Sequence, residues 1–291
     1  MEPIGVLVHG VSGRTGRQVL DTLCGEADMD TIGVVVHGVI GKMGQQVLAA
    51  LCDEADMEPV GGADAFAGGD TIALPDGSGT VPLFTSVEDA LGDAQVVVDF
   101  SSADGATAVM RAAAPLKVNV VIGSTGIQPE AVEEAGILAE EHGVGIVIAP
   151  NFAVGAVLMI HLAREAARFF DYADLTETHH EAKIDAPSGT AIAIANAALE
   201  GKGGEFLAPQ PEKVLVPGTR GGTSGGMTIH SARMPGRVAH HELIFGALGQ
   251  TLTIRHDSIN RESFMPGVMM AVREAVKRPG LTVGLDKIMG L

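Results

Sequence analysis

The chain has 291 residues, a length that favours about two domains. Hydrophobic residues make up 46% of it, enough for a sizeable core, and a formal net charge of −17 lacks the basic footprint that nonspecific nucleic-acid binding requires. No apolar run is long enough for a membrane span, no signal-peptide pattern opens the chain, and two cysteines are too few for a disulfide framework, so we expect a cytoplasmic protein that binds neither nucleic acid nor membrane.

The first part of the chain contains an internal repeat. Residues 4–30 reappear as residues 32–58, with 18 identities in 27 aligned positions, and each copy follows the order strand, glycine turn, helix. One sheet has room for one such unit at its first-strand position, and residues 32–58 lead directly into the next predicted strand. We therefore expect the second copy to be functional and residues 1–31 to be a duplicated βα unit or extension. The opposite assignment remains an alternative.

Residues 32–151 alternate between apolar strands and helical patterns. The predicted strands are 33–36, 59–61, 96–100, 119–122 and 145–149. Strands that are apolar throughout and alternate with helices are typical of a parallel sheet covered on both faces. The pattern predicts an α/β domain with a mostly parallel sheet, in which the turn-rich residues 67–85 form a surface excursion.

The glycine turn of the second copy, GVIGKMG at 38–44, lies between a predicted strand and a helix. Such a turn lets a dinucleotide's diphosphate approach the backbone at a helix start. Asp64, twenty residues beyond Gly44, is placed to accept hydrogen bonds from a ribose. No Arg or Lys directly follows Asp64, which favours NADH, whereas Lys42 leaves NADPH open. A purely structural turn is the alternative, since many strand-to-helix turns are glycine-rich.

The pattern changes after Pro150. A helix at 154–170 precedes alternating segments at 175–178, 227–231, 241–245 and 251–256, which predict an antiparallel or mixed sheet. Residues 201–226, rich in Gly and Pro, are expected to form a long flexible excursion. A last helix, 266–277, is assigned to the first domain. We thus predict a dinucleotide-binding domain at 32–151 and 262–291, and a second domain at 152–261.

The segment THHEAKIDAPSGT at 178–190 carries the residues best suited to chemistry. A histidine can transfer a proton near neutral pH, and Lys183 supplies a cation or a second acid. Ser188 or Thr190 would cap the following helix, whose start can bind an anion. A surface loop with an ordinary histidine pair is the alternative. No cysteine or HExxH pattern accompanies the pair, so we predict no metal site. Histidines at 230, 240, 241 and 256 lie near arginines such as Arg233, which suits a carboxylate substrate, unless these are solvated strand faces.

This segment resembles the HHxxKxDAPSGT signature of the 4-hydroxy-tetrahydrodipicolinate reductase (dihydrodipicolinate reductase) family. Supporting segments follow the family order: GVIGKMG, VVDFSS, GSTG, APNFAVGAVL and GQTLTIRHDSINRESFMPGV. The likeness spans about 32–291 and leaves the first copy of the repeat unexplained. It implies a Rossmann-like dinucleotide-binding domain, an α+β substrate and oligomerisation domain with a mixed sheet, and a homotetramer.

The resemblance also implies residue roles. His179 and Lys183 would be the proton donors. Substrate contacts would come from His180, Ser188, Gly189, Thr190 and Arg233. The cofactor would be held by Gly38, Val39, Ile40, Gly41, Lys42, Met43, Asp64, Phe100, Gly123, Ser124, Thr125, Pro150, Asn151, Phe152 and Ala153. Ser101 and Ser124 stand where the family pattern has Thr, which keeps the hydroxyl, and His37 before the glycine turn is unusual.

The implied reaction is reduction of 4-hydroxy-tetrahydrodipicolinate to tetrahydrodipicolinate in diaminopimelate and lysine biosynthesis. Hydride passes from nicotinamide C4 to ring C4 of this cyclic dicarboxylate, the 4-hydroxyl leaves as water, and a proton is delivered by His179 or Lys183. Two alternatives remain open from the sequence. In the first, the chain is a nucleotide-binding but inactive homologue that the duplication has disrupted. In the second, it is another nicotinamide-dependent amino-acid dehydrogenase.

Overall fold

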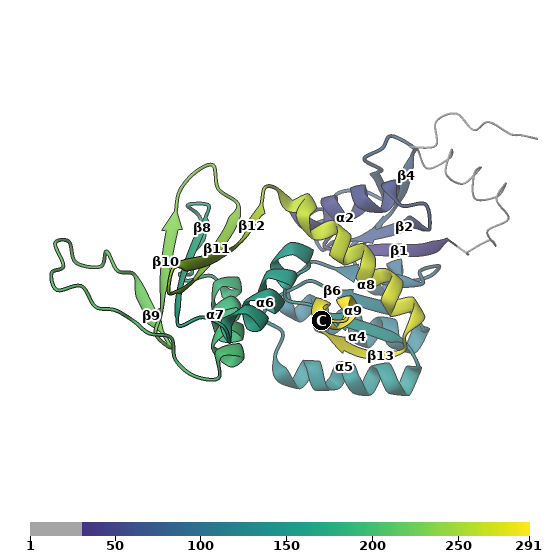
Figure 1. Cartoon of the computed structure of the whole chain (residues 1–291). Coiled ribbons are helices and arrows are strands. Elements are labelled where there is room, and N and C mark those ends of the chain that lie inside the picture. Colours follow the sequence, from purple (N-terminus) through teal and green to yellow (C-terminus); the bar gives the residue numbers. More distant parts are fainter. Residues whose placement is uncertain (1–30) are drawn as a thin grey trace, which may run out of the picture. The chain divides into compact units, whose positions relative to one another are not determined.

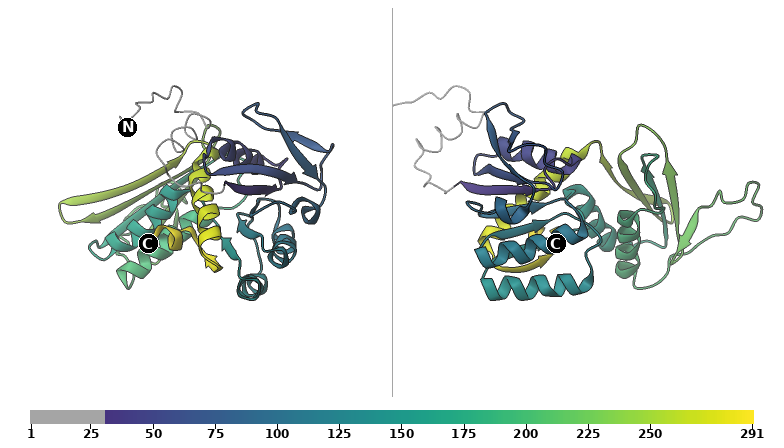
Figure 2. Two further views of the ribbon diagram at one scale, coloured as in Figure 1. Left: turned by 90° about the vertical axis from the view of Figure 1, so that its right-hand side faces the viewer. Right: turned by 180° about the vertical axis from the view of Figure 1, so that it is seen from behind.

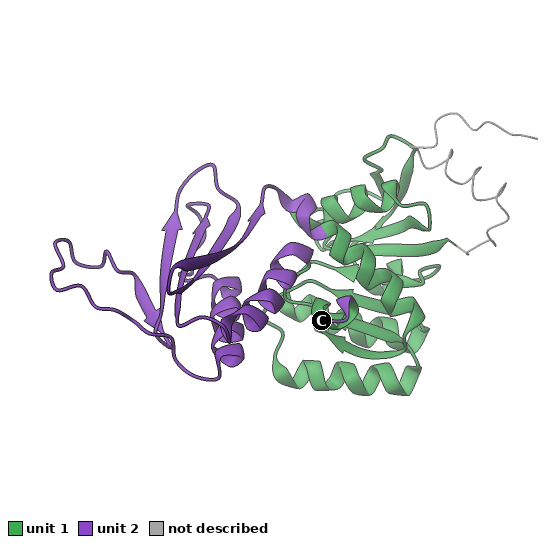
Figure 3. Ribbon diagram, viewed as in Figure 1, with its two compact units in different colours: residues 1–152, 265–288 green, residues 153–264, 289–291 purple. Residues whose placement is uncertain are grey.

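A computed structural model describes residues 31–291, so the prediction for the first copy of the repeat lies outside the described residues. The chain divides into two compact units, shown in different colours in Figure 3. Unit 1 comprises the described residues up to Phe152 together with Met265–Ile288. Unit 2 comprises Ala153–Phe264 and Met289–Leu291.

Unit 1 is built on a sheet of eight strands in the order β13-β7-β6-β5-β1-β2-β4-β3 (Figure 1). All neighbouring strands pair in parallel except β3 and β4, which are antiparallel. The predicted mostly parallel sheet is therefore confirmed. The strands are β1 Ile32–His37, β2 Met57–Ala63, β3 Thr71–Ala73, β4 Thr80–Phe84, β5 Val96–Asp99, β6 Asn119–Ile122, β7 Gly145–Ile148 and β13 Gly280–Val283.

Helices cover both faces of this sheet. One face carries α2 (Lys42–Asp53) and α8 (Met265–Lys277), and the other carries α3 (Val87–Ala90), α4 (Ala103–Ala113) and α5 (Pro129–His142). A short 3-10 helix, Ala114–Leu116, follows α4, another, Arg261–Phe264, precedes α8, and a short helix α9 (Leu285–Met289) follows β13. Coverage on both faces explains why the central strands read as uninterrupted apolar runs.

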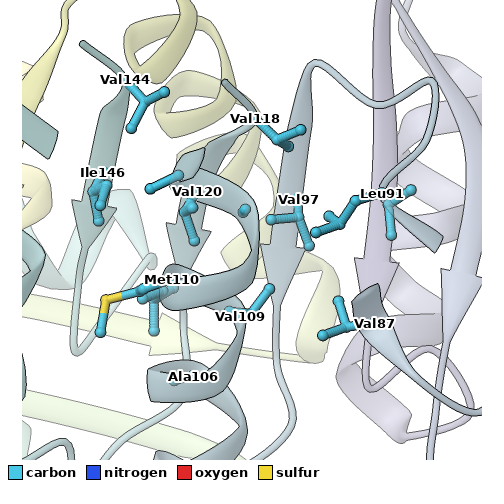
Figure 4. Packing of buried hydrophobic residues seen from close by; sticks show 14 of the residues in the cluster. Val87, Leu91, Val97, Ala106, Val109, Met110, Val118, Val120, Val144 and Ile146 are labelled. Carbon is cyan, nitrogen blue, oxygen red and sulfur yellow. The ribbon is translucent and has the colours of Figure 1, made fainter. Parts of the chain in front are cut away.

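The core of unit 1 is formed where α4 packs on the central strands (Figure 4). Val97 and Val120 from the sheet and Val109 and Met110 from α4 are fully buried. Burial of such a side chain contributes about 1.5–3 kcal/mol. Arg273 of α8 donates to both carboxylate oxygens of Asp56 at 2.7 Å, which fastens this helix beside the end of α2.

Three strands of unit 1, β3, β4 and β13, were not predicted from the sequence. Residues 67–85 are not merely a surface excursion, because β3 and β4 form a hairpin there and β4 pairs in parallel with β2. The turn residues between these short strands and Pro82 within β4 hid the strand pattern. The strand β13 was also missed, since Gly280 and Gly284 flank only a short apolar run.

Unit 2 contains a five-stranded mixed sheet in the order β12-β11-β8-β10-β9. Its strands are β8 Tyr172–His179, β9 Gly222–Ser224, β10 Met227–Arg233, β11 Ala239–Ala247 and β12 Gln250–Ser258. The pair β8 and β10 is parallel and the other pairs are antiparallel, as the mixed-sheet prediction requires. Figure 2 shows the long hairpin of β11 and β12 in yellow-green.

Two helices, α6 (Val154–Ala167) and α7 (Gly189–Lys202), pack on one face of this sheet. Met159 of α6, Ile194 of α7, Leu175 of β8 and Phe245 of β11 meet in its core. The predicted excursion at 201–226 is shorter in the structure, since α7 continues to Lys202 and β9 begins at Gly222. Among the described residues, no helix combines the length and apolar character needed to cross a membrane.

Candidate active site

A cavity of about 480 Å³ opens in unit 1 at the carboxyl ends of the strands. The chain runs from β1 to β2 on one side and later returns to β5 on the other side of β1. Open α/β sheets bind their ligands at such a switch point. The cavity is lined by His37, Gly38, Ile40, Gly41, Asp64, Ala65, Phe66, Phe100, Ser101, Ser102 and Gly105.

The glycine turn between β1 and α2 has a backbone that side chains would block. Gly38 has φ +77°, and a Cβ there would lie 2.7 Å from the carbonyl oxygen of Phe100. A Cβ at Gly44 would lie 2.2 Å from the carbonyl oxygen of Gly38. No side chain caps the start of α2, so this helix start presents backbone N–H groups where an anion can bind.

Asp64 directly follows β2 and holds the glycine turn in place. Its buried carboxylate accepts from the N–H of Ile40 and from the N–H of Phe66, each at 3.0 Å. A carboxylate has lone pairs for further donors, and Asp64 also lines the cavity. Asp64, which the sequence predicts to bind a ribose, therefore lies on the cavity wall. It also stabilises the glycine turn, a role that the sequence did not indicate.

The loops after β6 and β7 contain the residues predicted to surround a nicotinamide. A Cβ at Gly123 would lie 2.1 Å from the ring of Phe100, so these two pack closely. The rings of Phe100 and Phe152 are 6.0 Å apart. The Ser124 hydroxyl donates to the buried Asp99 at 2.6 Å, which orients it into the protein. Thr125, Pro150 and Asn151 follow the same strand ends, whereas Ala153 belongs to unit 2.

These features together fit a dinucleotide. Gly38 in the left-handed region, the uncapped helix start and a carboxylate at the end of β2 supply a turn for a diphosphate and an acceptor for a ribose. The cavity of about 480 Å³ lies within the usual range for small-molecule sites.

In unit 2, a buried glutamate organises the residues at the end of β8. Glu177 is fully buried, and its carboxylate accepts from the Arg233 guanidinium at 3.0 and 2.8 Å. It also hydrogen-bonds to Nδ1 of His179 and accepts from the N–H of Ser188 at 3.3 Å. A carboxylate bound to Nδ1 fixes the ring of His179 and leaves Nε2 for chemistry.

The pKa values of this pair follow from burial and from these bonds. Burial raises the pKa of the Glu177 carboxyl, but donors on Arg233, Ser231 and His179 outweigh it, so the pKa lies below its ordinary value. Burial also lowers the pKa of His179, the Glu177 carboxylate opposes that effect, and the nearby charge of Lys183 lowers the pKa further. Near neutral pH, Glu177 is therefore ionised and the His179 ring is neutral.

Arg233 lies beside His179, as the register of β10 and β8 places the two residues opposite each other. Both terminal nitrogens of its guanidinium are already engaged by Glu177 and by the carbonyl oxygens of Ala232 and Asp185. The arginine is thus held as the partner of Glu177. Glu177 was not predicted from the sequence, although it lies two residues before His179 on one strand and therefore on the same face.

The other predicted residues of this segment lie in the loop after β8 and at the start of α7. Ser188 is the N-cap, as expected: its Oγ accepts from the N–H of Ala191 and contacts Nε2 of His241, both at 3.1 Å. Gly189 and Thr190 follow as the first residues of α7. Lys183 pairs with Asp185 at 2.7 Å, and His180 is exposed. Among the described residues, no group of three or more potential metal ligands is found.

His241 gives the stability of the protein a specific pH dependence. Burial, followed by the charge of His179, lowers the pKa of His241 to about 4, from about 6.5 in the unfolded chain. Its contribution to stability is complete above pH 6.5 and is lost as the pH falls towards 4, because only the unfolded chain takes up the proton in that range. The loss is about 3 kcal/mol.

We expect the free energy of unfolding to fall less steeply between about pH 7 and pH 4 in His241→Gln than in the unchanged protein. Urea unfolding at both pH values measures this difference. The other groups that titrate in the range are common to both proteins. If the free energy of unfolding depended on pH equally in His241→Gln and in the unchanged protein, the lowered pKa of His241 would be contradicted.

Comparison with known proteins extends over both units. Residues 32–152 match the family model "Dihydrodipicolinate reductase, N-terminus", and residues 155–289 match "Dihydrodipicolinate reductase, C-terminus". A 4-hydroxy-tetrahydrodipicolinate reductase from Dehalococcoides mccartyi is 47% identical over 293 aligned residues, with 100% of each chain covered. One from Mycobacterium marinum is 43% identical over 213 residues, covering 72% of this chain and 85% of that one.

Solved structures agree with these matches. A dipicolinate-bound dihydrodipicolinate reductase from Paenisporosarcina sp. has a TM-score of 0.79 at 36% identity, covering 89% of this chain and 99% of that chain. An amine dehydrogenase from Mycobacterium smegmatis, with a TM-score of 0.60, 17% identity and coverage of 88% of this chain and 95% of that chain, shares the fold alone. The two family models together span nearly all of the described residues. The chain belongs to the dihydrodipicolinate reductase family.

Proposed function

We propose that this protein reduces 4-hydroxy-tetrahydrodipicolinate to tetrahydrodipicolinate with a reduced nicotinamide dinucleotide, in diaminopimelate and lysine biosynthesis. The observation that carries the proposal is the cluster at the end of β8, where a fixed histidine and a lysine precede an anion-binding helix start. The family match over both units supports the same activity. The bound nicotinamide supplies the hydride.

In unit 1, the residues of the cavity bind and orient the dinucleotide. The turn Gly38–Met43 and the start of α2 hold the diphosphate, and Asp64 accepts from a ribose. Phe100, packed on Gly123 and close to Phe152, gives the nicotinamide an apolar wall that excludes water. Further contacts in unit 1 come from Ser124, Thr125, Pro150 and Asn151, and Ala153, the first residue of unit 2, is the last predicted cofactor contact.

In unit 2, the residues of the cluster bind the dicarboxylate and move a proton. The N–H groups of Gly189 and Thr190 at the start of α7, with Ser188 and His180, bind substrate carboxylates. The charged Lys183 ammonium is the proton donor. The His179 ring is neutral near neutral pH, so its Nε2 accepts a hydrogen bond. Once Nε2 has taken up a proton, the ring can donate that proton. Arg233 acts through Glu177 and not by contact with the substrate.

A coupled assay tests the proposal. Enzymatically generated 4-hydroxy-tetrahydrodipicolinate is added to the protein with NADH or NADPH, and the absorbance of the reduced nicotinamide is followed. We expect it to fall in proportion to the protein added. A preparation that binds the dinucleotide without oxidising it would support the alternative of an inactive homologue. Oxidation of the reduced dinucleotide with amino acid precursors in place of this substrate would support another amino-acid dehydrogenase. The family match disfavours that alternative.

NADH is expected to be the preferred coenzyme, because the 2′-phosphate of NADPH would lie against the Asp64 carboxylate. Like charges brought together at a binding site are strongly unfavourable, so the Kd for NADPH should exceed that for NADH by about tenfold or more. Fluorescence titration with each coenzyme measures the ratio. In Asp64→Asn, the ratio of the Kd for NADPH to the Kd for NADH should be smaller. Tighter binding of NADPH than of NADH by the unchanged protein would refute this role of Asp64.

Assembly and location stay predictions. The family resemblance implies a homotetramer that assembles through the substrate domain. The composition predicts a cytoplasmic enzyme. Sedimentation analysis of the full chain tests the first of these.

A further inference from the structure

A buried carboxylate lies directly behind the cavity of unit 1. Asp99 is the last residue of β5 and is fully buried, and the register of β1 and β5 places it opposite His37. The Nδ1 atom of His37 is 2.8 Å from Oδ1 of Asp99. The unusual histidine before the glycine turn therefore stands beside an internal acid at the switch point of the sheet.

The remaining contacts of Asp99 come from neutral groups. The hydroxyl of Ser101 donates to Oδ1 at 2.5 Å, and the hydroxyl of Ser124 donates to Oδ2 at 2.6 Å. Of these three side chains, His37 alone can take a positive charge. A buried carboxylate is costly unless it is paired or well hydrogen-bonded, and a proton on His37 would give Asp99 a charged partner.

His37 also borders the space where an anionic ligand would lie. It lines the same cavity as Gly38 and Gly41, and a Cβ at Gly105 in the first turn of α4 would lie 3.2 Å from its Cε1. The ring therefore lies between the glycine turn and a second helix start. Its Nδ1 is buried on the Asp99 side, whereas its side chain is 14% exposed.

We propose that His37 takes up a proton from solvent when the dinucleotide binds. The diphosphate brings negative charge towards the Asp99 carboxylate, and an imidazolium between the two offsets both charges. The buffer loses the proton that the ring gains, so the step is balanced. Dinucleotide affinity then falls as the pH rises, by up to about tenfold per pH unit, the limit for one linked proton. The proposal rests only on the dinucleotide-binding part of the proposed function.

Four other charged side chains lie on the elements around His37. Glu88 of α3 is near enough to be influenced by it: its pKa is lowered mainly by the Ser86 hydroxyl and in a small part by His37. Asp64 follows β2, and Asp104 lies in the first turn of α4. Lys42 is the first residue of α2. Replacement of His37 leaves these four side chains in place, so a comparison with that variant isolates the contribution of the histidine.

Calorimetry of NADH binding tests the proposal with the full chain. The binding heat is measured near pH 7 in PIPES and in Tris, whose protonation enthalpies differ, and the difference gives the number of protons taken up. We expect uptake by the unchanged protein and none by His37→Asn. His142→Asn is the matched control, because His142 ends α5 just before β7 begins and so lies at the amino end of a strand, whereas the cavity lies at the carboxyl ends; this variant should retain the uptake.

A second variant keeps the proposal testable if His37→Asn does not fold. Asp99→Asn removes the buried charge, so NADH should bind with little proton uptake. Equal heats in the two buffers for the unchanged protein, or full uptake in either variant, would overturn the proposal. A protein that takes up the proton on binding NADH but does not reduce the substrate would instead refute the proposed function.

Discussion

Replacement of Lys183 by Ala is expected to lower kcat about 100- to 10,000-fold, the usual contribution of a general acid. Lys183 pairs with Asp185 in the loop after β8, and its charge is close enough to lower the pKa of His179. All cavity residues that we assign to the diphosphate and ribose lie in unit 1, so the Kd for NADH should not change. Steady-state kinetics and a fluorescence titration measure the two quantities.

Lys213→Ala is the matched control for this variant. Lys213 is exposed in the segment between α7 and β9 and has no assigned part in catalysis, so its loss should leave kcat unchanged. Full turnover by the Lys183 variant would exclude the lysine as the proton donor.

Replacement of Glu177 by Gln is expected to have an effect of similar size on turnover. The carboxylate holds Nδ1 of His179, and an amide in its place permits the other tautomer, in which Nε2 carries the proton. Loss of the carboxylate partner of a catalytic histidine lowers kcat about 10,000-fold in serine proteases, and we expect a decrease of about 100- to 10,000-fold here. The decrease should appear in kcat rather than in KM, and the pH profile of kcat should shift.

The structural part of this role is separable from the catalytic part. Glu177→Ala leaves the Arg233 guanidinium without its carboxylate and should lower the free energy of unfolding by about 3–5 kcal/mol, whereas Glu177→Gln retains an acceptor. Glu181→Gln, at an exposed position in the following loop, is the control for both measurements. If kcat and its pH profile were unaltered in Glu177→Gln, the role of Glu177 would be purely structural.

The parts of the candidate site that are local in the chain could be proposed from the sequence. The glycine turn, the Ser188 cap and the pair His179 and Lys183 each lie within a few residues, so spacing alone predicts how they can act together. Strands covered on both faces were equally accessible, because continuous burial leaves a continuous apolar run. The hairpin of β3 and β4 was missed because turn residues dominate its composition and its strands are short.

The remainder of the site depends on strand register, which the sequence alone does not reveal. Arg233 meets Glu177 only because β10 pairs in parallel with β8, and His37 meets Asp99 only because β1 lies beside β5. Both contacts join residues more than fifty positions apart, as in the 56-residue separation of Arg233 and Glu177. The sequence therefore suggested Arg233 as a substrate ligand, which stays a prediction, but did not indicate its bond to the buried Glu177.

The transfer of deuterium tests the central claim most directly. The protein is given NADH deuterated at C4 of the nicotinamide, together with freshly generated 4-hydroxy-tetrahydrodipicolinate, and the product is examined by mass spectrometry and NMR. Our account predicts deuterium at ring C4 of tetrahydrodipicolinate, formed at the rate at which NADH is consumed. A product without the label, or consumption of NADH with no change in the dicarboxylate, would contradict it.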